Sequence, residues 1–79
     1  MNSWLSQQAD ALAAAAGLDR AALELDSDEI DALLDLARIA AHESGDRRNA
    51  PLLCHLVGAA RASGKSVTEL AEAVRASTS

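Results

Sequence analysis

The sequence predicts an all-α protein, a compact antiparallel four-helix bundle. Ala and Leu together supply 31 of the 79 residues. The β-branched residues Val, Ile and Thr number only seven, and one tryptophan is the sole aromatic residue, which disfavours a β-sheet module. Four segments have apolar residues at helical spacing and are separated by short connections with capping residues. These observations favour helices over strands along the whole chain.

Length and charge limit the class of protein. A chain of 79 residues is expected to form a single helical domain over residues 1–79, with an ordered core over about residues 3–75. A single Cys cannot form an internal disulfide, and the N-terminus lacks the basic flank of a signal peptide, so we expect a cytoplasmic protein. No apolar run approaches the roughly 20 residues of a membrane span. The net charge of −5 makes the chain acidic and argues against nucleic-acid binding.

The charge is divided unevenly along the chain. Residues 1–37 hold eight acidic residues and one basic residue, a net charge of −7. Residues 38–79 hold four acidic and six basic residues, a net charge of +2. The sequence therefore predicts an acidic region and, beginning at Arg38, a local basic region.

The first helix is expected over residues 4–16. Ser3 is the predicted N-cap, and Gly17 stands where a left-handed residue ends a helix. Trp4 is expected to cover one end of the small core. A connector over residues 18–25 has room for one short turn. The predicted buried face of this helix consists of Leu5, Ala9, Leu12, Ala13 and Ala16.

The second helix has the clearest start. Asp26 and Glu29 have the spacing of a capping box, and the helix is expected to end near Ser44 and Gly45. Acidic side chains along its other side favour a solvated face, with a basic partner or a divalent ion as the alternative. These acidic residues are Asp28, Asp31 and Asp35. The predicted buried face consists of Ile30, Leu33, Leu34, Ala37, Ala40 and Ala41.

Two more helices complete the expected bundle. Pro51 fits the first turn of a third helix, which Gly64 ends. Ser66 and Glu69 have the spacing of a second capping box and open a fourth helix. The third helix is predicted to bury Leu52, Leu53, Leu56, Val57 and Ala60, and the fourth Val67, Leu70, Ala71 and Val74.

A cluster of basic side chains is the candidate binding site. Arg38 and His42 share one helical face, and Arg47 and Arg48 precede the third helix, whose N-terminus favours anions. These four residues, the basic cluster, predict contacts to a phosphate, nucleotide or carboxylate. The alternative is a solvated face in which Asp35 pairs with Arg38 and the loop arginines point to water. No Gly-rich phosphate loop accompanies the cluster.

Catalytic and metal sites have little support in the sequence. Cys54 and His55 are adjacent, so they point about 100° apart on a helix and are poorly placed as nucleophile and base. With His42 they offer at most three ligands, without the paired spacing of a zinc site. We therefore expect no enzyme, no bound metal and no cofactor, and the alternative is a hydrolase that uses Cys54 and His55.

Six short motifs follow one another along the chain: Trp4-Leu5, Gly17-Leu18-Asp19, Leu33-Leu34-Asp35-Leu36-Ala37-Arg38, Ala41-His42, Ala50-Pro51-Leu52 and Leu56-Val57-Gly58. In this order they resemble the motifs of a small bacterial helical domain of unknown function. The resemblance covers about residues 3–75. In that family the domain occurs alone or fused behind a molybdenum cofactor guanylyltransferase.

The resemblance implies a binding or accessory role rather than catalysis. The basic cluster matches the family pattern Ala-Arg…Ala-His…Arg…Ala-Pro-Leu, with either Arg47 or Arg48 as its third member. The nucleotide loop and metal-binding Asp of the guanylyltransferase have no counterpart here, and Cys54-His55 departs from the family. The expected function is an accessory module in biosynthesis or insertion of molybdopterin guanine dinucleotide, with the guanylyltransferase or a recipient molybdoenzyme as partner. The alternative is a protein-interaction or homo-oligomerisation module without a small-molecule ligand.

Overall fold

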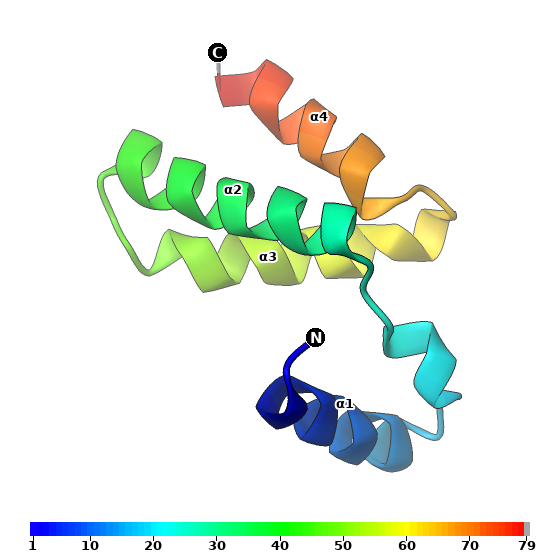
Figure 1. The fold of residues 1–79 in the computed structure, drawn as a ribbon. Coiled ribbons are helices and arrows are strands. Elements are labelled where there is room, and N and C mark those ends of the chain that lie inside the picture. The colour runs from blue at the N-terminus through cyan, green and yellow to red at the C-terminus, as the bar shows by residue number, and fades with distance from the viewer. Residues whose placement is uncertain (79) are drawn as a thin grey trace.

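The computed structural model describes residues 1–78 and is helical throughout its regular structure (Figure 1). The all-α architecture with four α-helices is confirmed. The long helices are α1 (Ser3–Ala16), α2 (Ser27–Ser44), α3 (Asn49–Ala60) and α4 (Val67–Thr78). Two short 3₁₀ helices, η1 (Arg20–Leu23) and η2 (Arg61–Ser63), lie in the connections after α1 and α3.

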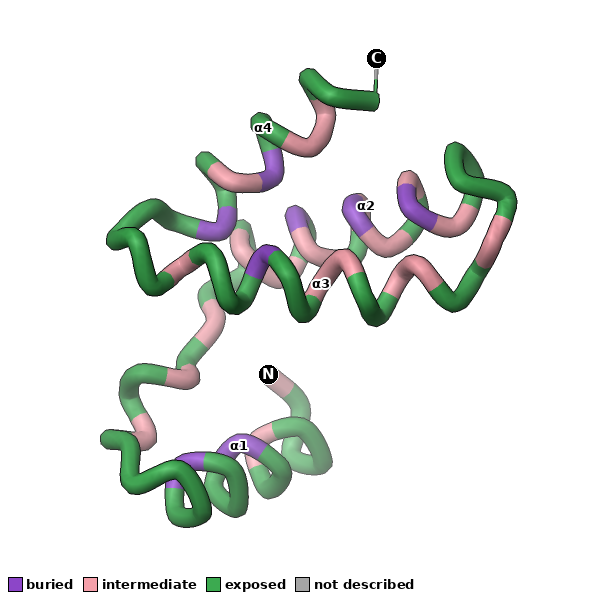
Figure 2. Tube along the Cα trace, turned by 180° about the vertical axis from the view of Figure 1, so that it is seen from behind, coloured by how far each residue is buried: buried purple, intermediate pink, exposed green. Residues whose placement is uncertain are grey.

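Helix α2 is the centre of the core. It packs along α3, to which a short turn joins it, and α4 packs across both (Figure 1). Helix α1 packs against η1 and lies away from the other three helices (Figures 1 and 2). The radius of gyration is accordingly 13.1 Å, against about 11.6 Å expected for a globule of this length. The chain thus combines a three-helix core with a more loosely attached first helix.

The core is small because its buried side chains are small. Leu36 is completely buried and Val67 nearly so, and they are the largest fully buried side chains of the described residues. The cluster of buried residues in the core consists of Ala32, Leu36, Val57, Val67 and Ala71. Leu33, Leu53, Leu70 and Val74 pack partly buried against it, so the predicted inner face of the fourth helix is confirmed.

Local capping signals define the helix ends as expected. Glu29 N donates to Asp26 Oδ1 at 2.8 Å, and Asp26 N donates to Glu29 Oε1 at 3.1 Å. Ser66 and Glu69 form the same reciprocal pair at the start of α4, with both distances 3.1 Å. Each capping box provides acceptors for two backbone N–H groups that would otherwise bond only to water.

Two further elements differ slightly from expectation. The N-cap of α1 is Asn2, whose Oδ1 accepts from Leu5 N at 2.8 Å, and Ser3 is already the first helical residue, so the prediction of Ser3 as cap is wrong. A side-chain amide oxygen one residue earlier makes the same kind of bond. At the other end of the chain, α4 continues to Thr78, beyond the expected core limit of residue 75.

The predicted buried faces are partly wrong. Leu34 on α2 and Leu52 and Leu56 on α3 were expected inside the core and are exposed, whereas Leu36 is the buried leucine of α2. The predicted face of α1 buries Ala9 and Ala13 and leaves its large members in solvent (Figure 2). Only part of the apolar face of each helix is covered by another helix. On α2 the covered part carries Ala32 and Leu36, because α4 packs against that side. The remaining large apolar side chains stay exposed.

Candidate functional site

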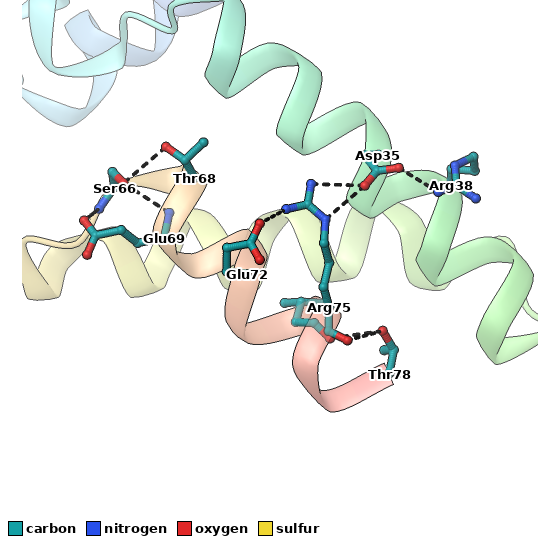
Figure 3. Close-up of polar contacts among 9 residues, drawn as sticks. Asp35, Arg38, Ser66, Thr68, Glu69, Glu72, Arg75 and Thr78 are labelled. Carbon is teal, nitrogen blue, oxygen red and sulfur yellow. Dashed lines mark hydrogen bonds and ion pairs between the residues drawn. The ribbon is translucent and has the colours of Figure 1, made fainter.

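The basic cluster extends from the second half of α2 to the turn before α3. Arg38 and His42 are one helical turn apart on α2, and Arg47 and Arg48 occupy the turn before α3; all four are exposed. Arg38 Nη2 donates to Asp35 Oδ1 at 2.7 Å (Figure 3). This contact is the pairing expected in the alternative to an anion site.

The second loop arginine is also paired within the chain. Arg48 donates from its backbone N to Asp46 Oδ1 at 2.9 Å and from Nη2 to Asp46 Oδ2 at 2.8 Å. The Arg48 side-chain hydrogen bonds lower the pKa of Asp46 below its ordinary value. A carboxylate of the protein itself therefore occupies the position beside Arg48 that an anionic ligand would take.

The start of α3 has few free amides for an anion. Asn49 N donates to Asp46 O at 3.1 Å, and Ala50 N donates to Arg47 O at 3.2 Å. Pro51 has no N–H to offer. An anion site at a helix start depends on unpaired N–H groups, and here the preceding turn already satisfies them. The anion-binding role of Arg38, His42, Arg47 and Arg48 stays a prediction, and the hydrogen bonds of this end favour the solvated alternative.

Asp35 of α2 accepts hydrogen bonds from two arginines, and the one from Arg75 joins α2 to α4. Arg75 of α4 donates from both Nε and Nη2 to Asp35 Oδ2 at 3.1 Å, while Arg38 binds the other carboxylate oxygen (Figure 3). The hydrogen bonds from Arg38 and Arg75 lower the pKa of Asp35 from its ordinary 3.8. Arg75 also bonds Glu72 one turn earlier on α4. Sequence reasoning missed Arg75, because nothing local connects residues 40 positions apart.

The sequence-adjacent Cys54 and His55 do not form a catalytic pair. Cys54 is half-buried, and its Sγ lies 3.8 Å from Leu33 O, whereas His55 is exposed. Burial raises the pKa of the Cys54 thiol, which disfavours the thiolate that a nucleophile needs. Within residues 1–78 no group of three His, Cys, Asp or Glu side chains is arranged to hold a metal ion.

Large apolar side chains are the main feature of the surface. Trp4, expected to cover an end of the core, is instead 67% exposed, so that prediction is wrong. It lies on α1, outside the helix-packing contacts that bury Ala9 and Ala13. The other exposed large apolar residues are Leu5, Leu12, Leu18, Leu34, Leu52 and Leu56.

Two apolar grooves collect most of these side chains. The α1 groove, of about 250 Å³, lies between α1 and the η1 connection. Its lining residues are Met1, Leu5, Gln8, Ala9, Leu12, Leu23, Leu25 and Arg61. The α3 groove, of about 330 Å³, lies between α2, α3 and the end of α4. Its lining residues are Ala40, Ser44, Asn49, Leu52, Leu53, Leu56, Val74, Ser77 and Thr78.

Comparison with known proteins gives the family but no activity. None of the helices in residues 1–78 combines the length and apolar character needed to cross a membrane. No curated protein matches the chain, and no solved structure does. One family model matches residues 1–79, that of the Domain of unknown function (DUF6457). This match extends over the whole helical chain described above, and the protein therefore belongs to the DUF6457 family.

Proposed function

We propose that this protein is a non-enzymatic accessory module that binds another protein through its apolar surface. The observation that carries this proposal is that six of its twelve leucines are exposed. Single exposed leucines are ordinary, but leucines gathered in grooves are typical of protein-interaction sites. The half-buried thiol and the paired arginines offer no comparable support for catalysis.

The resemblance to domains fused behind a molybdenum cofactor guanylyltransferase supplies the expected partner. We assign the module to molybdopterin guanine dinucleotide biosynthesis or insertion, where it binds the guanylyltransferase or a recipient molybdoenzyme. Exposed Leu52 and Leu56 are one turn apart on α3 and supply apolar surface that a partner protein can bury. Serine, threonine and asparagine side chains also line this groove and suit the polar rim of such an interface.

A small-molecule function through the basic cluster is the second candidate. It rests on the exposed His42 and Arg47, for which no hydrogen bond or ion pair of the side chain is found within the described residues. Against it stand the Asp35 and Asp46 carboxylates, which already pair with Arg38 and Arg48, two of the three arginines of the cluster. The apolar surface is therefore the better-supported site.

Calorimetric titration of the protein with a molybdenum cofactor guanylyltransferase tests the proposal. We expect binding that Leu52→Glu and Leu56→Glu each weaken at least about tenfold, because a buried carboxylate replaces an apolar contact. Leu34→Glu changes a leucine that lines neither groove and serves as the matched control. Absence of binding to both the guanylyltransferase and a molybdoenzyme would overturn the proposal.

A second titration separates the two candidate functions. GTP or molybdopterin guanine dinucleotide at millimolar concentration is added while backbone amide shifts are followed by NMR. We expect no saturating shifts over residues 38–52. Saturating shifts that Arg47→Ala or Arg48→Ala abolishes would replace the protein-binding function with nucleotide binding at the basic cluster.

A further inference from the structure

Helix α1 buries small side chains and exposes large apolar ones, which is the opposite of ordinary helix packing. It buries Ala9 and Ala13, while Trp4 is 67% and Leu12 62% exposed. An amphipathic helix in its final packing buries its large apolar side chains, since they contribute most of the hydrophobic free energy. Leu5 and Leu12 line the α1 groove but remain exposed, and Trp4 lies outside that groove, so the described chain covers this face of α1 only in part.

The α3 groove offers a surface of the complementary kind. Leu52 and Leu56 stand exposed beside it, and Ala40 of α2 contributes to its lining. The described lining residues carry no charge. Their hydroxyl and amide groups lie around an apolar centre that a helix with uncharged side chains would cover.

Charge favours α1 as the helix that fills this groove. Among residues 3–16, Asp10 is the one charged residue, and Arg20 Nε donates to its Oδ1 at 2.7 Å. Helices α2 and α4 each carry several charged residues, and α3 is already part of the core. Placing α1 in the α3 groove therefore desolvates no unpaired charge, which is the main cost of closing an apolar interface.

The chain exposes more surface than a monomer of its mass should, and the excess is close to the area that one interface buries. The chain exposes 5433 Å², whereas a monomer of 8.2 kDa is expected to expose about 4,500 Å². The excess of about 900 Å² is close to the roughly 800 Å² that each partner buries in a standard protein–protein interface. One interface of ordinary size would bring the chain to the surface area of a normal small protein.

We propose that two copies of this protein form a symmetric dimer in which α1 of each copy lies in the α3 groove of the other. Each copy has one such helix and one such groove, so a two-fold arrangement uses both and closes the assembly. Trp4 and Leu12 pack against Leu52 and Leu56 of the second copy, with rows of side chains four residues apart interdigitating. This inference rests on the proposed function, because the second copy uses the same apolar surface and therefore competes for the α3 groove with the guanylyltransferase or molybdoenzyme.

Sedimentation equilibrium of the full chain and its variants tests the dimer. For the dimer we expect a dissociation constant of about 1 µM. At about 100 µM the wild-type protein should therefore be mostly dimeric, with a mass of twice 8.2 kDa. Leu12→Glu and Leu56→Lys are each expected to give monomers, because each places an unpaired charge in both copies of the interface. Leu34→Glu, at a leucine 65% exposed and outside both grooves, is expected to remain a dimer. Helix content measured by circular dichroism confirms that each variant folds.

Mixing the two monomeric variants tests the reciprocal geometry. A mixed dimer of Leu12→Glu with Leu56→Lys has one unchanged contact and one contact in which the new charges are opposite. We therefore expect the mixture to recover the mass of a dimer although neither variant does so alone. A monomeric wild-type chain, a mixture that stays monomeric, or an equal loss in Leu34→Glu would each overturn the proposal.

The partner titration separates this inference from the proposed function. A chain that is monomeric but binds the guanylyltransferase through Leu56 would overturn the dimer and leave the accessory function standing. A chain that associates with neither a second copy nor the guanylyltransferase or molybdoenzyme would overturn both.

Discussion

Replacing the buried leucine of α2 gives the most direct test of the packing. Leu36→Ala removes three carbon atoms from a side chain that is 0% exposed between α3 and α4. At about 0.8 kcal/mol for each buried methylene-sized group, the lost transfer free energy is about 2.4 kcal/mol. The cavity adds to this, so we expect a loss of about 3 kcal/mol in the free energy of unfolding. A single core of this size supplies only about 3–5 kcal/mol, so the variant should retain about 0–2 kcal/mol and have from about 3% to about half of its molecules unfolded at room temperature.

Leu34→Ala is the matched control in the same helix. Because Leu34 is 65% exposed, its replacement should cost less than about 1 kcal/mol and leave no cavity. Urea unfolding followed by circular dichroism measures both variants, at one protein concentration because association adds to stability. Equal losses, or a larger loss for Leu34→Ala, would refute the placement of Leu36 rather than Leu34 in the core.

Three further predictions concern single side chains. Hydrogen bonds from Arg38 and Arg75 lower the pKa of Asp35 in the folded protein below its ordinary 3.8. The ionised carboxylate therefore stabilises the fold above pH 3.8, and this stabilisation is lost as the pH falls through the lowered pKa of the folded state. Asp35→Asn should therefore lower the thermal midpoint near neutral pH, and the difference should shrink in acid; a constant difference contradicts the linkage. Gly58→Ala should raise the thermal midpoint and add up to about 1 kcal/mol to the free energy of unfolding, because Ala favours the helix and no atom of another helix lies within 4 Å of the new Cβ. A lower midpoint would show a close contact there. Cys54 should react with a disulfide reagent more slowly in the folded protein than in urea, since burial raises its thiol pKa, and equal rates would contradict that burial.

The helix ends are predictable from sequence because their stabilising contacts are local. Asp26 and Glu29 satisfy each other's backbone amides across three residues, and the same holds for Ser66 and Glu69. Gly17 adopts φ +68° at the end of α1, a conformation that disfavours side chains with a Cβ. Such signals need no knowledge of the tertiary fold. The predicted cap Ser3 is wrong by one residue, because the neighbouring Asn2 also has a side chain that caps helices.

The buried faces are less predictable because apolar residues nearly surround the helices. Helix α2 has Leu33, Leu34 and Leu36 within four residues, so the periodic pattern fits more than one orientation. Which of them is buried depends on where α4 packs, and the Asp35–Arg75 ion pair joins residues 40 positions apart. The Asp46–Arg48 pair, by contrast, spans two residues and lies within reach of sequence reasoning. Contacts between distant segments are the part of the site that the sequence alone does not specify.

The abundance of alanine connects the composition to the exposed surface. Alanine lets helices approach closely, and Ala32 and Ala71 are buried where α2 meets α4. However, an alanine contributes little apolar area, so a core built around it gains little hydrophobic free energy. Six leucines remain outside that core, where the hydrophobic free energy they carry is released only on association with another protein. Burying Leu12 and Leu56 at an interface would therefore stabilise the fold and the complex together, and variants at these two positions should lose stability only at concentrations where the wild-type chain is associated.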